Sequence, residues 1–289
     1  MNKNLKTAAK ILVAILAANI LLTIINQYFF ENSLEFKTAS RILLSLFTLL
    51  FISKFEFLKE LRPSKKTFIF SFLSLFLFVV SIFNVNSSLI ATGFVVSTYN
   101  HTIFILSCLA IGIFEELLFR VFLYQFTYKF ISKNIIFSLL FCSILFGIAH
   151  LSNLVFSDYY KISIINQVLF AISIGLLLQS IYIKTKSVVL IVFLHAIINY
   201  LGSYKKNILT KVVSTSETYT FEDFLTSFIS ILLLTFLVII PISYFLEIDQ
   251  SNIDLGTAKY SKGAAEPQAY CKKYKICLPI EIVYRDVFD

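Results

Sequence analysis

Long apolar stretches separated by short polar segments fill most of the chain. A helix needs ~20 mostly apolar residues to cross the hydrocarbon core of a bilayer. Eight stretches are candidates, and the second is the shortest because Lys54 and Glu56 follow it closely. They are Ala9–Phe30, Ile42–Ile52, Phe68–Val85, Thr102–Phe126, Ile135–Leu151, Ile162–Tyr182, Val188–Leu201 and Phe224–Leu246. The pattern predicts an all-α polytopic membrane protein, with about eight transmembrane helices in a bundle.

Composition agrees with this prediction and excludes most soluble classes. Apolar residues make up 58% of the chain and charged residues 15%, whereas soluble domains average ~25% charged residues. The net charge of +8 comes from Lys and Arg that flank the apolar stretches, where basic residues set membrane orientation. We therefore expect the lipid bilayer as a partner and no nucleic acid.

The distribution of basic residues predicts the orientation. With the N-terminus inside, 18 Lys and Arg lie on the cytoplasmic side, and six, including Lys37 and Arg41, fall on the outer side. This excess predicts a multi-pass protein of the cell membrane with both termini in the cytoplasm. Residues 1–247 then form the transmembrane domain, and residues 248–289 form a polar cytoplasmic tail. A composition rich in Lys, Ile, Asn and Phe suggests a low-GC bacterium.

The fourth apolar stretch contains three ionisable residues, Glu115, Glu116 and Arg120. Each charge at the centre of a membrane helix costs ~2.5–3.5 kcal/mol on insertion scales. The three charges must therefore be paired, face inward or be partly protonated. Glu116 and Arg120 are four residues apart on one helical face, so we expect an ion pair between them. Glu115 is rotated by ~100° and faces another partner.

Two later stretches supply polar partners at a similar depth. The fifth ends at His150, and the seventh contains His195 and Asn199, which lie one turn apart on one face. Together with the two glutamates, these side chains predict a polar cavity buried in the bundle. Glu115 could take a proton from water that His150 helps to position, while His195 and Asn199 stabilise an oxyanion. This is amide hydrolysis by activated water, for which no cofactor is expected.

The same groups also allow a metal-dependent alternative. Zinc could be held by His150, His195 and Glu115, which would give metal-assisted hydrolysis. The compact His-Glu-x-x-His spacing is missing from the sequence, so the zinc site ranks second.

Three motifs in order resemble the CPBP family of CAAX prenyl endopeptidase and bacteriocin-processing membrane proteins, also called Abi. They are Glu-Glu-x-x-x-Arg at 115–120, Phe-x-x-x-His at 146–150 and His-x-x-x-Asn at 195–199. The resemblance covers residues 105–202. It implies an eight-helix bundle with a cavity open to the cytosol, and an intramembrane glutamic endopeptidase. It also implies that Glu115 and His150 activate water, that His195 and Asn199 form the oxyanion hole, and that Glu116 and Arg120 support the site.

The resemblance implies a peptide or lipidated peptide as substrate, with a role in bacteriocin immunity or peptide maturation. A non-catalytic scaffold or immunity protein that binds a partner is the main alternative. A proton-coupled transporter is a third interpretation, since intramembrane carboxylates and imidazoles also build proton relays. The sequence shows no repeated halves of the kind that many transporters have.

Overall fold

The computed structural model describes residues 3–55, 57, 65–91, 97–153, 161–208 and 220–240. The chain divides into two compact units, residues 1–247 and 248–289, and all described residues lie in the first. The predicted tail, 248–289, therefore lies outside the described residues. Within the described ranges every regular element is a helix.

The helices span most of the described residues. In chain order they are α1 (Lys3–Phe29), α2 (Leu34–Lys54), α3 (Lys65–Ala91), α4 (Thr98–Glu116), η2 (Leu117–Leu123), α5 (Tyr124–Phe126), η3 (Thr127–Ile131), α6 (Ile135–Ala149), η4 (His150–Ser152), α8 (Lys161–Thr185), α9 (Val188–Ile208), α10 (Phe221–Leu234) and η5 (Thr235–Ile239).

Among the described residues, six helical stretches are long and apolar enough to cross a membrane, and Val188–Tyr204 is a shorter apolar helix. The six are Lys6–Phe29, Leu34–Lys54, Thr67–Ser87, Thr98–Ile131, Ile135–Ser152 and Ser163–Thr185. The predicted fold class, an all-α polytopic membrane protein, is confirmed. The predicted eighth span, Phe224–Leu246, begins within α10, and its part beyond residue 240 lies outside the described residues.

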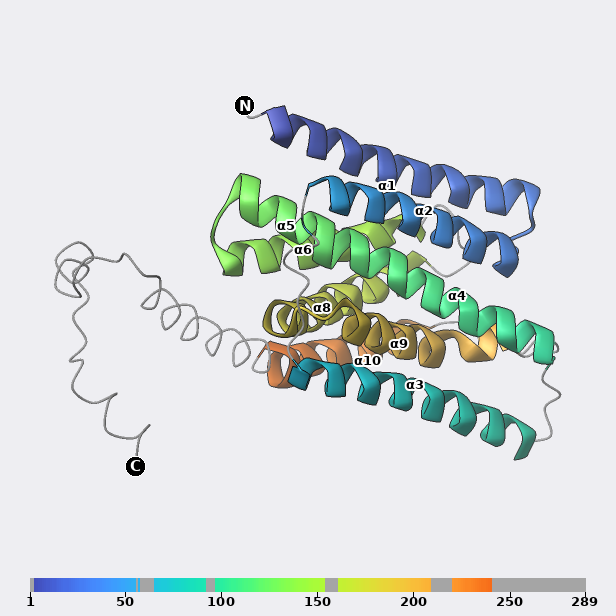
Figure 1. Cartoon of the computed structure of the whole chain (residues 1–289). Helices are drawn as coiled ribbons and strands as arrows, with labels where there is room; N and C mark the ends of the chain where they lie inside the picture. The colour runs from blue at the N-terminus through green and yellow to red at the C-terminus, as the bar shows by residue number, and fades with distance from the viewer. Residues whose placement is uncertain are drawn as a thin grey trace, which may run out of the picture. The chain divides into compact units, whose positions relative to one another are not determined.

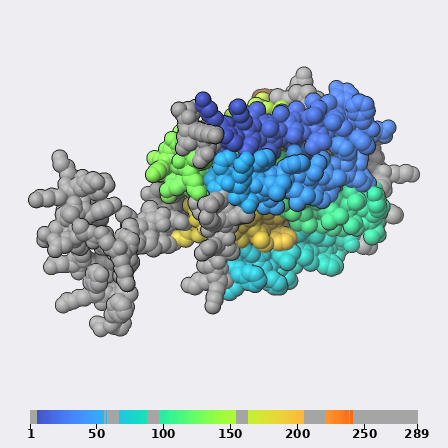
Figure 2. All heavy atoms as spheres, turned by 45° about the horizontal axis from the view of Figure 1, so that its top comes forward, coloured from blue at the N-terminus to red at the C-terminus, as the bar shows by residue number. Residues whose placement is uncertain are grey.

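Helix α4 lies between α2 and α9, and α9 in turn packs against α3 (Figure 1). On another side, α6 packs against α8, which also contacts α10 and α9. The space-filling view shows α1 and α2 lying side by side over one face (Figure 2). Of the helices that carry the three motifs, α4 packs against α2 and α9 packs against α3, two helices from outside the motif region.

Helix α2 begins earlier than the predicted stretch Ile42–Ile52. Ser33 caps it by accepting a hydrogen bond from the Phe36 amide at 3.2 Å, as N-cap serines do. The turn before it uses positive φ angles at Glu31 (49°) and Asn32 (59°). Lys37 and Arg41, which were counted on the outer side, both belong to this helix. The apolar pattern alone did not locate the start of α2, because the polar cap Ser33 sets it.

The fourth helix runs without a break from Thr98 to Ile131, but its hydrogen bonding changes along the way. After Glu116 it becomes π-helical in η2, and the Tyr124 amide bonds to the Phe119 carbonyl five residues back. All seven side chains of η2 are buried. Short π-helical segments are rare and frequently occur at functional sites. This one starts directly after the paired glutamates and contains Arg120.

Three glycines permit close contact between the helices. A Cβ atom on Gly112 would lie 3.2 Å from the Val192 carbonyl oxygen and 3.8 Å from His195 Cβ. A Cβ on Gly147 would lie 2.9 Å from the Val168 carbonyl, and one on Gly175 would lie 3.2 Å from Ser143 Cα. Small residues allow membrane helices to approach closely. Gly112 therefore sets the distance between α4 and the segment of α9 that carries His195.

Candidate active site

Glu116 lies at the centre of the polar cluster and is completely buried. Its Oε2 is 3.2 Å from Nε of Arg120, which is 1% exposed, so the predicted ion pair is present. Its Oε1 is 2.5 Å from Nδ1 of His195. A buried carboxylate is tolerated when a counter-charge and hydrogen bonds compensate for its lost hydration. Arg120 on the same helix supplies the counter-charge for Glu116, and His195 on α9 supplies a hydrogen bond.

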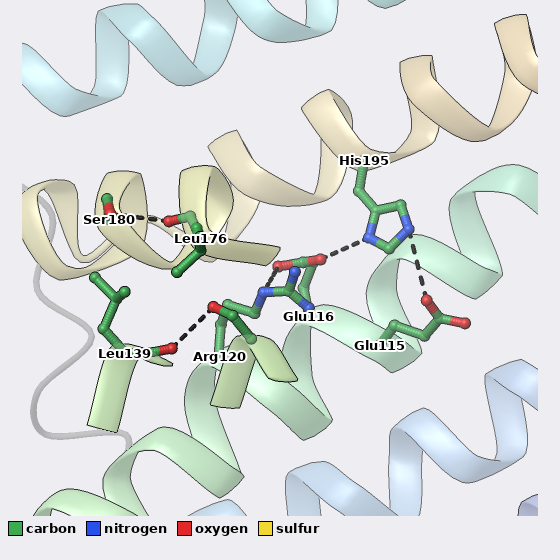
Figure 3. A network of polar contacts seen from close by, with 8 residues as sticks. Glu115, Glu116, Arg120, Leu139, Leu176, Ser180 and His195 are labelled. Carbon is green, nitrogen blue, oxygen red and sulfur yellow. Dashed lines mark hydrogen bonds and ion pairs between the residues drawn. The ribbon is translucent and has the colours of Figure 1, made fainter. Parts of the chain in front are cut away.

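His195 lies between the two adjacent glutamates. Its Nδ1 faces Glu116, and its Nε2 is 3.6 Å from Oε2 of Glu115, as Figure 3 shows. The Glu115 side chain is 20% exposed, in contrast to the closed surroundings of Glu116. Neighbouring positions on a helix point ~100° apart, and the imidazole fills the angle between them. The partner that Glu115 was predicted to face is thus His195.

The pairing of Glu116 also indicates the protonation of the His195 ring. Because Arg120 keeps a positive charge, its partner Glu116 is best described as a carboxylate, which only accepts hydrogen bonds. His195 Nδ1 then carries the proton that is donated to Glu116. In the neutral imidazole this leaves Nε2 as an acceptor. The nitrogen nearest Glu115 is consequently able to accept a proton.

The Phe146 ring contacts both imidazoles and the arginine. Its centroid lies 4.9 Å from that of His150 and 5.9 Å from that of His195, with both pairs close to perpendicular. The guanidinium carbon of Arg120 lies 4.1 Å from the same centroid, within the range of a cation–π interaction. The aromatic position of the Phe-x-x-x-His motif is therefore an integral part of the site. Sequence analysis gave Phe146 no role beyond the motif itself.

His150 ends α6 and is half-buried. Its Nδ1 donates to the carbonyl oxygen of Phe146 at 2.9 Å, because a carbonyl can only accept. Among the described residues no hydrogen bond or ion pair joins His150 to Glu115. The structure therefore brings Glu115, Glu116, Arg120 and His195 into one network, and relates His150 to it through Phe146.

Asn199 lies one turn after His195 on α9. Its Nδ2 is buried and has no hydrogen-bond partner among the described residues. A buried donor without a partner is unfavourable in the resting protein. Such a donor is available for an oxygen atom of a bound substrate. Its position near His195 agrees with the relation predicted from the His-x-x-x-Asn spacing.

Comparison with known proteins bears on this site. Residues 97–201 match the family described as "Type II CAAX prenyl endopeptidase Rce1-like". This segment is similar to that family. It contains all three motifs and overlaps the predicted region 105–202. No curated protein and no solved structure matches the chain.

The Rce1-like segment carries the polar network on α4, η2 and α9, and His150 at the end of α6. Helices α1, α2, α3 and α10 lie outside the matched residues. The match indicates a CAAX-type membrane protease.

The zinc alternative requires at least three ligands that point to one position. Among the residues that the structure describes, no three His, Cys, Asp or Glu side chains are grouped in this way. Of the three candidate ligands, His195 and Glu115 lie close together, while His150 Nδ1 bonds to its own helix. The observed donor set therefore does not fit a tetrahedral zinc site, and no step below uses a metal.

One functional neighbour was missed because it lies on α2. Arg41 places its guanidinium carbon 5.5 Å from the centroid of Phe114, the residue before Glu115. Counting basic residues for orientation leaves such a cation without a place in the bundle. A basic residue at the edge of an apolar stretch was the signal available in the sequence.

Proposed function

We propose that the protein is an intramembrane glutamic endopeptidase that cleaves a membrane-associated or lipidated peptide with water activated by Glu115. The observation that carries the proposal is the position of His195 between Glu115 and Glu116. A purely structural ion pair would need only Glu116 and Arg120. The second acid is partly exposed, and it faces the imidazole nitrogen that is free to accept a proton.

The first step is attack by water on the scissile carbonyl. Two acceptors, Glu115 Oε2 and His195 Nε2, lie 3.6 Å apart, so one water molecule can be within hydrogen-bond reach of both. Glu115 takes one proton as the water oxygen bonds to the carbonyl carbon. The carbonyl π electrons move to oxygen, and a tetrahedral oxyanion forms. His195 orients the water, and Glu116 holds the His195 ring as an acidic partner holds a catalytic imidazole.

The second step is collapse of the tetrahedral intermediate. The oxyanion electrons re-form the carbonyl, the C–N bond breaks, and the protonated Glu115 gives its proton to the departing nitrogen. Donors aimed at the oxyanion lower the barrier by ~3–4 kcal/mol each. We assign this role to Nδ2 of Asn199, which has no other described partner. The products are a carboxylic acid and an amine, and Glu115 returns to its ionised form.

This proposal differs in one respect from the roles that the family resemblance implies. We pair Glu115 with His195 for water activation, because these two side chains are adjacent. His150 then acts from the edge of the site. Its Nδ1–H is held by the Phe146 carbonyl, so Nε2 of the neutral ring faces outward as an acceptor that can orient the substrate or exchange protons.

The surroundings of the site support a substrate class. Helices α2 and α9 flank α4, and both carry exposed apolar side chains. These apolar surroundings favour a lipidated or apolar segment. We extend the proposal to bacteriocin immunity or peptide maturation in a low-GC bacterium, with both termini of the protein in the cytoplasm.

The test compares peptides from cells that express the wild-type protein or Glu115→Gln at matched levels. Mass spectrometry of the membrane and secreted fractions is expected to find a fragment that only the wild type produces. Glu222→Gln is the matched control, since Glu222 is an exposed acid in the first turn of α10. A phenotype that persists in Glu115→Gln without any such fragment would favour the scaffold interpretation.

A further inference from the structure

Two rows of side chains run next to each other along α9. His195 and Asn199 are the site residues of this helix, and each is followed directly by a completely buried residue, Ala196 or Tyr200. Ala196 and Tyr200 pack into a separate apolar cluster with Phe78 and other residues of α3 and α4. Neighbouring positions on a helix point ~100° apart. The direction of the buried row therefore determines the direction of the row that serves the site.

Tyr200 is held by both helices that pack against α9. Its hydroxyl oxygen lies 2.8 Å from Nε2 of His101, near the start of α4. Its ring centroid lies 5.4 Å from that of Phe104 and 6.0 Å from that of His101. From α3, the ring of Phe78 meets it edge-on at 6.2 Å. Hydrogen bonds and aromatic contacts both depend on orientation, so this side chain resists rotation of α9 about its own axis.

The hydroxyl of Tyr200 distinguishes this arrangement from simple packing. A phenylalanine would fill the same apolar cluster without placing a polar group in it. Burial of a hydroxyl is unfavourable unless it has a hydrogen-bond partner, and here His101 supplies that partner across two helices. The polar pair therefore adds a directional link between α4 and α9 that apolar packing alone does not provide.

Asn199 depends on this link because it lies between two fixed points of α9. On one side, His195 is bonded to Glu116 at 2.5 Å. On the other side, Tyr200 is the last buried residue before the exposed positions 201–203, and a Cβ atom on Gly202 would meet nothing within 4 Å. Nδ2 of Asn199 has no hydrogen-bond partner among the described residues. Its direction is consequently set by the backbone that carries it.

We propose that Tyr200 is a positioning residue of the hydrolytic site, which together with His101 fixes the rotation of α9 and thereby directs Nδ2 of Asn199 at the oxyanion. The inference rests on the proposed function. A rotation of ~10° moves an atom that lies ~6 Å from the helix axis by ~1 Å. A misplacement of ~1 Å can lower a reaction rate by ~10²-fold. A small rotation of α9 is therefore sufficient to remove most of the contribution of Asn199.

The supporting contacts reach beyond the three motifs. Tyr200 and His101 lie within the family match over residues 97–201 but at none of the motif positions, and Phe78 lies outside the match. Helix α3 thus takes part in orienting the site, although it carries none of the proposed reacting groups.

The first test removes the hydroxyl and keeps the ring. In Tyr200→Phe, kcat is expected to fall by roughly 3–10-fold, with little change in KM and an unfolding temperature close to that of wild type. His101→Leu is expected to lower kcat at least as much. His101→Gln is expected to stay near wild type, because an amide can also bond to the hydroxyl. Tyr99→Phe is the matched control, since exposed Tyr99 loses a bond of 2.9 Å to Glu35 at the same end of α4.

A double-mutant cycle separates a positioning role from a structural one. In a protein that already carries Asn199→Leu, Tyr200→Phe is expected to lower kcat by less than about twofold, because residues that act through one another are not additive. A change that only loosens the protein lowers kcat by the same factor in both backgrounds. Equal factors overturn the proposal, as does an unchanged kcat in Tyr200→Phe alone. If Tyr200→Phe does not fold, His101→Leu takes its place in the cycle.

Hydrogen–deuterium exchange provides a measurement that needs no turnover, because it reports local opening. In purified full-length protein, peptides from the second half of α9 are expected to exchange faster in Tyr200→Phe and His101→Leu than in wild type, Tyr99→Phe or His101→Gln. Equal exchange in all five proteins overturns the proposal. A wild type that cleaves no peptide contradicts the proposed function, and the positioning role falls with it. Cleavage by wild type and by Tyr200→Phe at the same kcat overturns the positioning role alone.

Discussion

Nδ1 of His195 lies 2.5 Å from Oε1 of Glu116, although the two residues are 79 positions apart in the chain. This contact fixes α9 against α4 and determines which ring nitrogen of His195 turns toward Glu115. The adjacent glutamates consequently have different environments. Glu116 is completely buried between two cationic or donor groups, while Glu115 is partly exposed. Glu116 can therefore stabilise the packing of the helices, while Glu115 is available for the reaction.

Glu116→Gln is expected to lower both stability and activity. It leaves Arg120 buried without its counter-charge, and removal of one partner from a buried pair costs ~3–5 kcal/mol. Thermal unfolding in detergent measures the first effect, and peptide cleavage measures the second. The double variant Glu116→Leu with Arg120→Met is expected to be more stable than Glu116→Leu alone, yet inactive. Equal stability of these two variants would contradict the ion pair.

Asn199→Leu is expected to lower kcat by roughly 10²–10³-fold, with a smaller change in KM, because an oxyanion donor acts mainly in the transition state. The side chains have similar volumes, and Nδ2 has no other described partner, so stability is expected to change little. Steady-state kinetics on a cleaved peptide separates the two constants. A change confined to KM would assign Asn199 to substrate binding instead.

Phe146→Leu is expected to reduce activity more than stability. Leucine retains an apolar side chain at the position, but the edge contacts with His150 and His195 and the cation–π contact with Arg120 are lost. Aromatic pairs of this kind contribute ~0.5–1.5 kcal/mol beyond burial. Cleavage rate and unfolding temperature are compared for wild type, Phe146→Leu and Phe146→Tyr. An unchanged rate in Phe146→Leu would show that the ring has no positioning role.

Gly112→Val is expected to abolish cleavage by separating α4 from α9. The first added atom already lies 3.2 Å from the Val192 carbonyl, so the larger side chain pushes the helix that carries His195 away from Glu116. Gly202→Val is the control, because a Cβ atom there meets nothing within 4 Å. A Cys pair introduced across α4 and α9 reports the separation by its rate of crosslinking. Equal rates and equal activity in both valine variants would contradict this explanation.

Chelators are expected to leave activity unchanged. The described residues contain no group of three metal-binding side chains, and the proposed steps use only Glu115, His195 and Asn199. Cleavage by purified protein is measured after treatment with EDTA or 1,10-phenanthroline, and again after zinc is added back. A loss of activity that zinc restores would favour the alternative with His150, His195 and Glu115 as ligands.

The sequence predicted the membrane class and the Glu116–Arg120 pair, because apolar length and helical spacing are local properties. It also predicted that Glu115 faces a different partner. It did not predict the contact of Arg41 with Phe114, since Arg41 lies just before the predicted stretch that begins at Ile42. The contacts of Phe146 and the contact of His195 with both acids depend on how three helices pack. The spacing of residues within a single helix does not determine these contacts.

The π-helical segment η2 holds one residue more than an ordinary α-helix with the same number of turns. The widened turn accommodates the extra residue, so the helix before and after it keeps its phase. Deletion of one residue from 117–123 would therefore convert the segment to an ordinary α-helix and leave the ring of Tyr124 facing Tyr182, which it meets edge-on at 6.2 Å. In alignments of related proteins, a gap of one residue in this segment is therefore compatible with the same bundle and the same three motifs.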